Sequence, residues 1–245
     1  GGGSGGGPAG AGGSGVVILR YPTADLPYFT TTGTLNTPSA TDTVADTAYP
    51  VTNLAYYKLD SNANDSSGNG YNGTATNVTY ENGRFNEAAN FNGSSSVIDL
   101  PDPLNITTDF TLSGWVSAVS GAAISYLYSS TDTNTNLIHF NFGVQPSQNR
   151  FFVVYKDVVY YTNLTYESGW HHYAITFNGT SLKVYRNGSL LVTHSISTLA
   201  STSGSKQTIG ARVRQNYNDF GTGSIDQVRI FSSALAPGDV EDLYN

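Results

Sequence analysis

The chain has 245 residues, of which 38% are hydrophobic, 12% aromatic and only 12% charged, and its net charge is −7. Lys and Arg form no cluster, so the composition argues against a nucleic-acid groove or an anionic membrane as the partner. The absence of cysteine excludes a disulfide framework and thiolate metal sites, and no apolar run approaches the roughly 20 residues that span a bilayer. Methionine is absent as well, so we expect the chain to be the C-terminal part of a longer or processed polypeptide.

The N-terminal part of the chain has no pattern typical of a packed core. Residues 1–15 are almost only Gly, Ser, Ala and Pro, which fits either a flexible linker or a glycine-rich fibre without the strict period of collagen. A short β-type run at 16–21 follows and predicts the last strand of a glycine-rich region at 1–21. Residues 22–53 hold four prolines among Thr, Ala and Asp without a sustained period, and they predict an extended linker.

From residue 54 the sequence changes to short strand-like runs separated by turn residues. The expected strands cover residues 54–59, 85–91, 96–100, 110–118, 122–128, 137–142, 151–155, 158–162, 171–177, 182–186, 190–194, 206–209 and 224–231. Their number and spacing predict two packed antiparallel sheets. We expect one domain over residues 54–245, and the alternative is two smaller sandwiches divided near residue 120.

Two hairpins and one helix are expected near the C-terminus. Asn178-Gly179 and Asn187-Gly188 each separate strand-like runs, and Asn-Gly readily supplies the positive φ angles of a type I′ turn. A short helix is predicted over residues 236–244, because Pro237 suits the first helical position and acidic residues follow it in the first turn.

Seven segments in a fixed order carry a family resemblance. They are residues 57–60 (YKLD), 65–70 (DSSGNG), 89–94 (ANFNGS), 110–116 (FTLSGWV), 169–172 (GWHH), 184–188 (VYRNG) and 223–231 (GSIDQVRIF). Together they resemble the laminin-G-like members of the concanavalin A-like lectin/glucanase superfamily. The resemblance implies an all-β, antiparallel two-sheet jelly-roll sandwich over residues 54–245 with a short C-terminal helix. One departure is Ala236, where relatives often place a Ser, and it should weaken the helix cap by about 1 kcal/mol.

The resemblance also implies a function. Such domains are usually non-catalytic modules of large extracellular, cell-surface or phage fibre proteins, and the glycine-rich run resembles the end of glycine-rich domains in phage and bacterial surface proteins. We therefore expect a structural or adhesion module of a virion appendage or cell surface. Its expected partners are a cell-surface or extracellular glycan, other fibre or virion subunits, and further copies in a homo-oligomer. The alternative is an accessory domain of a larger glycan-degrading enzyme.

A calcium site is expected from the resemblance, since laminin-G-like relatives can bind a cation at the sandwich edge. Asp65 and Asp226 are the candidate ligands if the first and last strands lie side by side. Asn62 and Asn64 could complete the hard-oxygen shell that one structural Ca²⁺ requires. The alternative is that both carboxylates accept ordinary turn and strand-end hydrogen bonds.

Several tyrosines lie on the expected strands and could stack on the apolar faces of sugar rings. The candidates are Tyr126, Tyr128, Tyr155, Tyr160 and Tyr161. The alternative is that these rings are half-buried packing residues with their hydroxyls in water.

Catalysis is not expected. Retaining glycosidases place two carboxyl groups roughly 5 Å apart, but Glu81, Glu87, Glu167 and Glu241 include no pair at strand spacing. No Gly-x-Ser-x-Gly elbow appears between the strand-like runs, since the spacing occurs only within the glycine-rich residues 1–15. The adjacent His171-His172 pair should point to opposite faces of a strand, so the two imidazoles could not easily share a metal ion.

Overall fold

The computed structural model describes residues 53–101, 106, 109–119, 124–132, 134, 138–155, 157–163, 167–196, 205–214 and 218–245. The expected glycine-rich region at 1–21 and all but the last residue of the expected linker at 22–53 lie outside the described residues. The boundary between that linker and the folded domain therefore stays a prediction.

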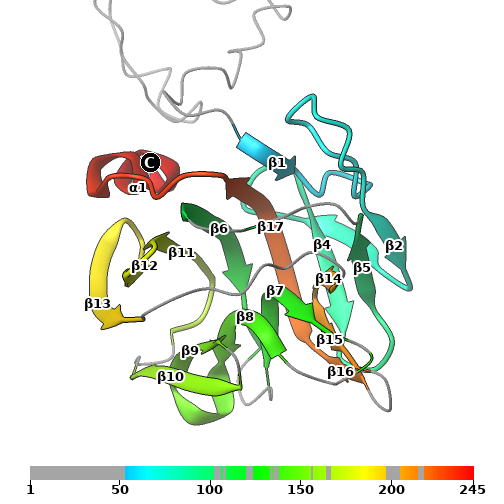
Figure 1. Cartoon of the computed structure of the whole chain (residues 1–245). Coiled ribbons are helices and arrows are strands. Elements are labelled where there is room, and N and C mark those ends of the chain that lie inside the picture. The colour runs from blue at the N-terminus through cyan, green and yellow to red at the C-terminus, as the bar shows by residue number, and fades with distance from the viewer. Residues whose placement is uncertain are drawn as a thin grey trace, which may run out of the picture. The chain divides into compact units, whose positions relative to one another are not determined.

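The larger sheet has eight antiparallel strands, and it joins the beginning of the domain to its end (Figure 1). Its path runs through β13 (Ser189–Ser195), β12 (Ser181–Arg186), β11 (Trp170–Asn178), β6 (Asp109–Ser117), β17 (Thr222–Phe231), β4 (Glu87–Asn92) and β3 (Thr79–Asn82), while β1 (Asn53–Tyr57) pairs with β17. In this pairing Tyr57 stands opposite Val228. The first and last strands of the domain are therefore neighbours, as the calcium prediction assumed.

The second sheet has seven antiparallel strands and faces the first. Its order is β10 (Val158–Asn163), β9 (Arg150–Tyr155), β8 (Ile138–Gln145), β7 (Ser125–Thr131), β14 (Lys206–Ile209), β5 (Val97–Leu100) and β2 (Thr74–Thr76). A small hairpin of β15 (Ala211–Val213) and β16 (Asn218–Phe220) lies beside it, and a 3₁₀ turn, η2 (Pro146–Gln148), joins β8 to β9. Strands from before and after residue 120 are paired in both sheets, since β17 pairs with β4 and β14 pairs with β5. Neither sheet divides near that residue, and the predicted all-β two-sheet fold is confirmed.

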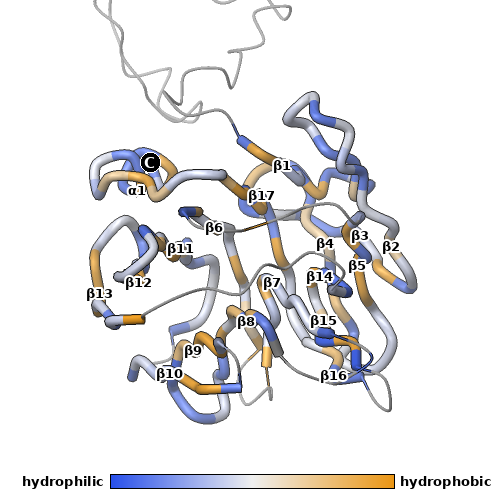
Figure 2. The backbone as a smooth tube through the Cα atoms, in the orientation of Figure 1, coloured by the Kyte–Doolittle hydropathy of each residue, from blue (hydrophilic) through white to orange (hydrophobic). Residues whose placement is uncertain are grey.

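The core lies between the sheets and follows from the alternation of apolar residues along the strands (Figure 2). On β11, Tyr173, Ile175 and Phe177 point into this core. Their neighbour Ala174 points to the opposite face of the sheet, where Leu235, Val240 and Leu243 pack in a second apolar cluster. Burial of each large apolar side chain contributes about 1.5–3 kcal/mol, so both faces of the larger sheet contribute to stability.

The C-terminal helix, α1 (Pro237–Tyr244), begins where proline predicted it. Ala236 occupies the N-cap and has no side-chain oxygen to cap the helix, as expected from the sequence. The backbone N–H of Ala236 nevertheless donates to Oδ2 of Asp239 at 3.1 Å, so half of a capping box remains. Among the described residues no helix is long and apolar enough to cross a membrane.

The two Asn-Gly hairpins differ from each other. Asn187 and Gly188 have φ angles of 49° and 75°, which match the predicted turn. Asn178 instead stays in β11 as its last residue, and its side-chain oxygen accepts a 2.9 Å hydrogen bond from the backbone N–H of Ser181. At this turn Gly179 is left-handed, with a φ of 87°, and Asn178 is not. The hydrogen bond from Ser181 to the Asn178 side chain closes the turn instead.

Candidate functional site

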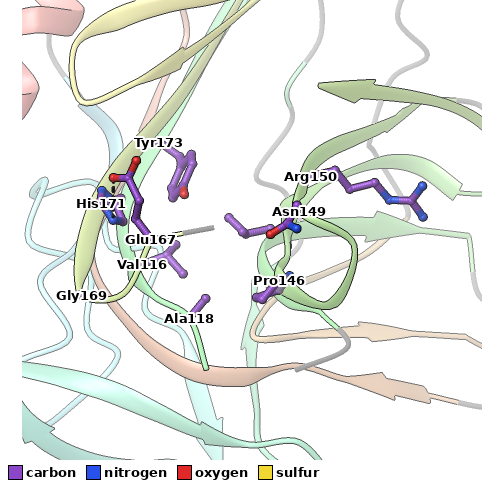
Figure 3. Close-up of a pocket in the computed structure, with 10 residues that line it drawn as sticks. Val116, Ala118, Pro146, Asn149, Arg150, Glu167, Gly169, His171 and Tyr173 are labelled. Carbon is purple, nitrogen blue, oxygen red and sulfur yellow. Dashed lines mark ion pairs between the residues drawn. The ribbon is translucent and has the colours of Figure 1, made fainter. Parts of the chain in front are cut away.

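A shallow, open hollow with a cavity volume of about 10 Å³ lies where the ends of β6 and β11 approach the connection between β8 and β9 (Figure 3). Its apolar lining consists of Val116, Ala118, Val144, Pro146 and Tyr173, and the rest consists of Asn149, Arg150, Glu167, Gly169 and His171. We call this hollow the end pocket. It brings together side chains from strands that are distant in the sequence.

The floor of the end pocket is apolar and rigid. Tyr173 is 5% exposed, and its ring stacks on Phe151 with centroids 5.5 Å apart and planes 14° apart. Val116 is buried on the neighbouring strand β6. Across from them, η2 ends at Asn149, which adopts the left-handed conformation with φ 49°. The pocket thus combines a fixed apolar floor with polar groups at its rim, the usual make-up of a small-ligand site.

The polar rim is organised around Glu167. Nη2 of Arg186 lies 2.8 Å from Oε2 of Glu167 and 3.2 Å from Nε2 of His171, while Nδ2 of Asn187 lies 3.2 Å from Nδ1 of His171. Burial and the Arg186 cation lower the pKa of His171, and the Glu167 carboxylate offsets this only in part. His171 is therefore neutral at pH 7, and the rim presents a carboxylate with an uncharged imidazole.

The predicted tyrosine platform is not formed. Tyr126 and Tyr128 are each 1% exposed, and the hydroxyl of Tyr128 donates a 2.7 Å hydrogen bond to Oε1 of Gln207. Tyr155 is buried as well. Buried rings cannot offer a face to a sugar, so the prediction for these three residues is wrong. Tyr160 is half-buried with its ring 5.2 Å from that of His194. Tyr161 is 47% exposed.

Asp65 is not free to bind a metal ion. Its Oδ1 accepts hydrogen bonds from the backbone N–H groups of Tyr56 at 2.9 Å and Ser67 at 2.8 Å, and its Oδ2 accepts one from the N–H of Tyr71 at 3.0 Å. Although burial alone would raise it, these hydrogen bonds hold the pKa of Asp65 below its usual value. Asp65 therefore accepts ordinary turn and strand-end hydrogen bonds, as the alternative to the calcium site predicted, and the structure contradicts its role as a calcium ligand.

The two asparagines of the calcium prediction are also engaged locally. Oδ1 of Asn62 accepts a 2.9 Å hydrogen bond from the backbone N–H of Asn64, and Nδ2 of Asn62 donates a 3.0 Å bond to the carbonyl of Asp60. Both asparagines are exposed. These contacts describe a surface turn rather than a shell closed around an ion.

Asp226 is different, because it is 0% exposed and its Oδ1 has no hydrogen-bond partner. Its Oδ2 accepts a hydrogen bond from the N–H of Phe85 at 2.9 Å. Burial and the neighbouring carboxylate of Asp60 raise the pKa of Asp226 to about 6, although hydrogen bonds from the backbone lower it in part. The structure therefore places Asp60, rather than Asp65, beside Asp226. Among the described residues no group of three or more His, Cys, Asp and Glu side chains could hold a metal ion.

The predicted separation of the two histidines agrees with their places in the structure. His171 lies at the end pocket, whereas His172 is buried with its ring 5.4 Å from that of Trp115. No local sequence pattern marked Pro146, Asn149 and Glu167 as pocket residues, since each lies in a turn or loop whose position depends on the paired strands.

Comparisons with known proteins agree with this architecture. A family model described as "Concanavalin A-like lectin/glucanases superfamily" matches residues 92–241. No curated protein sequence matches the chain.

Three solved structures illustrate the likeness in fold. Domain 4 of AbnA, a GH43 extracellular arabinanase from Geobacillus stearothermophilus in complex with arabinotriose, is 24% identical with a TM-score of 0.64, covering 80% of this chain and 99% of that one. The binding domain of Paraclostridial Mosquitocidal Protein 1 is 22% identical with a TM-score of 0.61, and the match covers 80% of this chain and 52% of that chain. A structure of botulinum neurotoxin type C, a toxin whose cell entry is described as dependent on interaction with two ganglioside molecules, is 18% identical with a TM-score of 0.58. The match covers 79% of this chain and 51% of that chain.

This chain spans about half the length of the two toxin chains and nearly the whole arabinanase domain. At these identities the solved structures establish the fold alone. The matched family model covers more than half of the chain, from β4 to α1. The chain belongs to the concanavalin A-like lectin/glucanases superfamily.

Proposed function

We propose that the domain is a non-catalytic carbohydrate-binding module and that the end pocket is its sugar site. The observation that carries the proposal is a hollow that combines an apolar lining, reached at the half-buried Ala118, with the hydrogen-bonding groups of Asn149, Glu167 and His171. A sugar ring offers an apolar face to the first and hydroxyl groups to the second. The arabinanase domain was solved in complex with arabinotriose, and the neurotoxin is described as interacting with two ganglioside molecules, so the proposal has support from proteins of similar fold.

The proposal is tested by filling the pocket. Ala118 lines it, whereas Val119, the next residue, is 48% exposed and does not line it. We expect Ala118→Trp to abolish binding of oligosaccharides identified on a glycan array, and Val119→Trp to leave the affinity in calorimetry unchanged. Equal affinity in the two variants would place the sugar elsewhere and overturn the proposed site.

The wider setting remains our proposal of a structural or adhesion module in a phage fibre or bacterial surface protein. The competing proposal, an accessory domain of a glycan-degrading enzyme, is supported by the arabinanase domain of similar fold. Sequencing the full gene separates them, since fibre domains upstream would favour the first and a catalytic domain would favour the second.

Contact with other subunits is supported by two apolar sheet edges. Within the described residues β10 pairs only with β9, and β13 only with β12. Neither strand contains Lys, Arg, Asp or Glu, although edge strands are usually protected by charge. The exposed apolar side chains on them are Val158, Val159, Tyr161, Leu190 and Leu191.

We propose that these two edges carry the contact between copies in a homo-oligomer or with fibre subunits. The double variant Val159→Lys with Leu190→Lys should shift sedimentation velocity toward the monomer at micromolar concentration. A wild-type protein that is already monomeric at the highest concentration reached would contradict the homo-oligomer.

One structural Ca²⁺ also remains a proposal, with its residues revised to Asp226 and Asp60. The proposal is supported by the buried Oδ1 of Asp226, which has no hydrogen-bond partner, beside the carboxylate of Asp60. Asp60 accepts one backbone hydrogen bond, from the N–H of Glu87 at 3.1 Å, whereas Asp65 accepts three. When bound, the ion would neutralise the repulsion between the two carboxylates. Binding would stabilise the fold by about 2.7 kcal/mol at a calcium concentration of a hundred times Kd.

The calcium proposal predicts different behaviour for two matched variants. Millimolar calcium should raise the Tm of the wild type relative to EDTA, Asp226→Asn should lose this shift, and Asp65→Asn should keep it while unfolding at a lower Tm in both buffers. Coinciding wild-type curves in calcium and EDTA would contradict the site.

A further inference from the structure

The charges around the end pocket are distributed unevenly, and their arrangement bears on which sugars the pocket can accept. Among its lining residues, Arg150 is the one permanent cation and Glu167 is the one carboxylate. Arg186 stands behind Glu167 and His171 at the rim. The charge that a ligand meets therefore depends on where these two guanidinium groups point.

The guanidinium group of Arg150 points away from the end pocket (Figure 3). Its Nε donates a 2.8 Å hydrogen bond to Oε1 of Gln145, and its guanidinium carbon lies 3.7 Å from the ring centre of Tyr161. A cation held over an aromatic face is stabilised there. Arg150 thus contributes its aliphatic stem to the pocket and its charge to the neighbouring surface.

Arg186 is committed to the rim itself. Its side chain is 12% exposed, and its Nη2 forms the 2.8 Å ion pair with Glu167 and also contacts His171. Its Nε is buried. The side chain of Glu167, in contrast, is 57% exposed, so the charged group that a ligand meets at the rim is a carboxylate. Burial and Arg186 lower the pKa of His171, which leaves the imidazole uncharged at neutral pH.

We infer that the end pocket selects uncharged sugars and discriminates against sugars that carry a carboxylate or another anionic group. The inference rests on the proposed sugar-binding function. The exposed Glu167 oxygen can accept hydrogen bonds from sugar hydroxyls, and charge-assisted bonds of this kind are stronger than neutral ones. An acidic sugar brings a second negative charge to the same rim, where the two described guanidinium groups, those of Arg150 and Arg186, already bind Gln145 and Glu167.

The inference predicts the outcome of a paired comparison in calorimetry at pH 7. The probes are a neutral oligosaccharide that the domain binds and the same oligosaccharide with one added sialic or uronic acid residue. Because Glu167 is partly exposed and solvent screens its charge, we expect the acidic form to bind about tenfold more weakly. The ratio should shrink as the salt concentration rises toward 1 M, where the Debye length falls to about 3 Å.

A charge-neutral variant tests the assigned residue. Glu167→Gln keeps the size of the side chain but releases Arg186 from its ion pair, so this variant should bind the acidic sugar as well as or better than the neutral one. Glu81→Gln is the matched control, since Glu81 is exposed on β3, at the opposite end of the larger sheet from β12 and β13, and it should retain the tenfold preference.

The outcomes separate the inference from the function on which it depends. Equal or tighter binding of the acidic sugar by the wild type would overturn the charge selection and leave the sugar-binding module intact. An unchanged preference in Glu167→Gln would overturn the role of Glu167. Failure of every sugar to bind would overturn both the inference and the proposed function.

Discussion

Oδ2 of Asp226 accepts a hydrogen bond of 2.9 Å from the backbone N–H of Phe85, 141 residues earlier in the chain. The last long strand therefore holds the turn that joins β3 to β4. Phe85 is 42% exposed, and its ring meets the ring of Trp115 edge-on with centroids 5.9 Å apart. The buried carboxylate thus organises one edge of the larger sheet, and its charge makes that edge sensitive to pH.

The first prediction concerns Asp226 in EDTA. Its pKa is raised to about 6 in the fold, so the native state binds a proton more tightly than the unfolded state. This contribution is fully present below the unfolded pKa near 4 and is lost as the pH rises through about 6, by up to about 3 kcal/mol. Asp226→Asn should flatten this part of the pH dependence and raise the Tm at pH 7. A wild-type pH profile that Asp226→Asn leaves unchanged would contradict the assignment.

The second prediction has the opposite sign and concerns His172. Burial and the Arg229 cation lower its pKa to about 3, so the native state keeps the imidazole neutral. The contribution to stability is fully present above the unfolded pKa of about 6.5 and is lost as the pH falls toward 3. His172→Phe should reduce the acid sensitivity measured by urea unfolding between pH 6.5 and 4. Equal slopes in the wild type and variant would show that His172 can be protonated within the fold.

The third prediction concerns the junction of β14 and β15. Gly210 has a φ of 83°, and a Cβ atom there would overlap the buried ring of Phe91. Gly210→Ala should therefore lower the free energy of unfolding by roughly 3 kcal/mol or more. Gly238→Ala is the control, since no atom lies near its Cβ position at the start of α1, and it should be neutral or slightly stabilising. Equal effects of the two substitutions would contradict the close packing at Gly210.

The fourth prediction concerns the missing helix cap. Ala236→Ser should add a side-chain oxygen for the first turn of α1 and stabilise the domain by about 0.5–1 kcal/mol. The measurement is urea unfolding, compared with Ala236→Val, which adds bulk without a hydrogen-bond acceptor. No difference between Ser and Val would show that the Asp239 hydrogen bond already suffices.

The sequence predicted the long strands because their apolar residues alternate or cluster between turns. The run at 206–209 matches β14 at both ends. The strands β2, β3, β15 and β16 were missed, since each has only three or four residues and is defined by the partner that it pairs with. On β7 every residue is buried, so alternation could not show that Tyr126 and Tyr128 lie inside.

The candidate sites were harder to predict because they depend on distant partners. Asp226 was a candidate from its strand motif, but its neighbour Asp60 was identified only once β1 and β17 were paired. Asp65 carries the same carboxylate and was indistinguishable in sequence, yet three backbone N–H groups bind it. The end pocket combines the ends of β6 and β11 with the turn after β8, and no local pattern marks such a combination.

The central claim, that a sugar binds in the end pocket, is tested most directly by a titration of the ¹⁵N-labelled domain followed by NMR. We predict that a neutral oligosaccharide such as arabinotriose shifts the amide signals of Asn149, Gly169 and His171 together along one saturable curve. The amides around Phe85 at the other candidate edge should stay in place. Saturable shifts confined to the Phe85 turn, or no shifts at millimolar sugar, would contradict the claim.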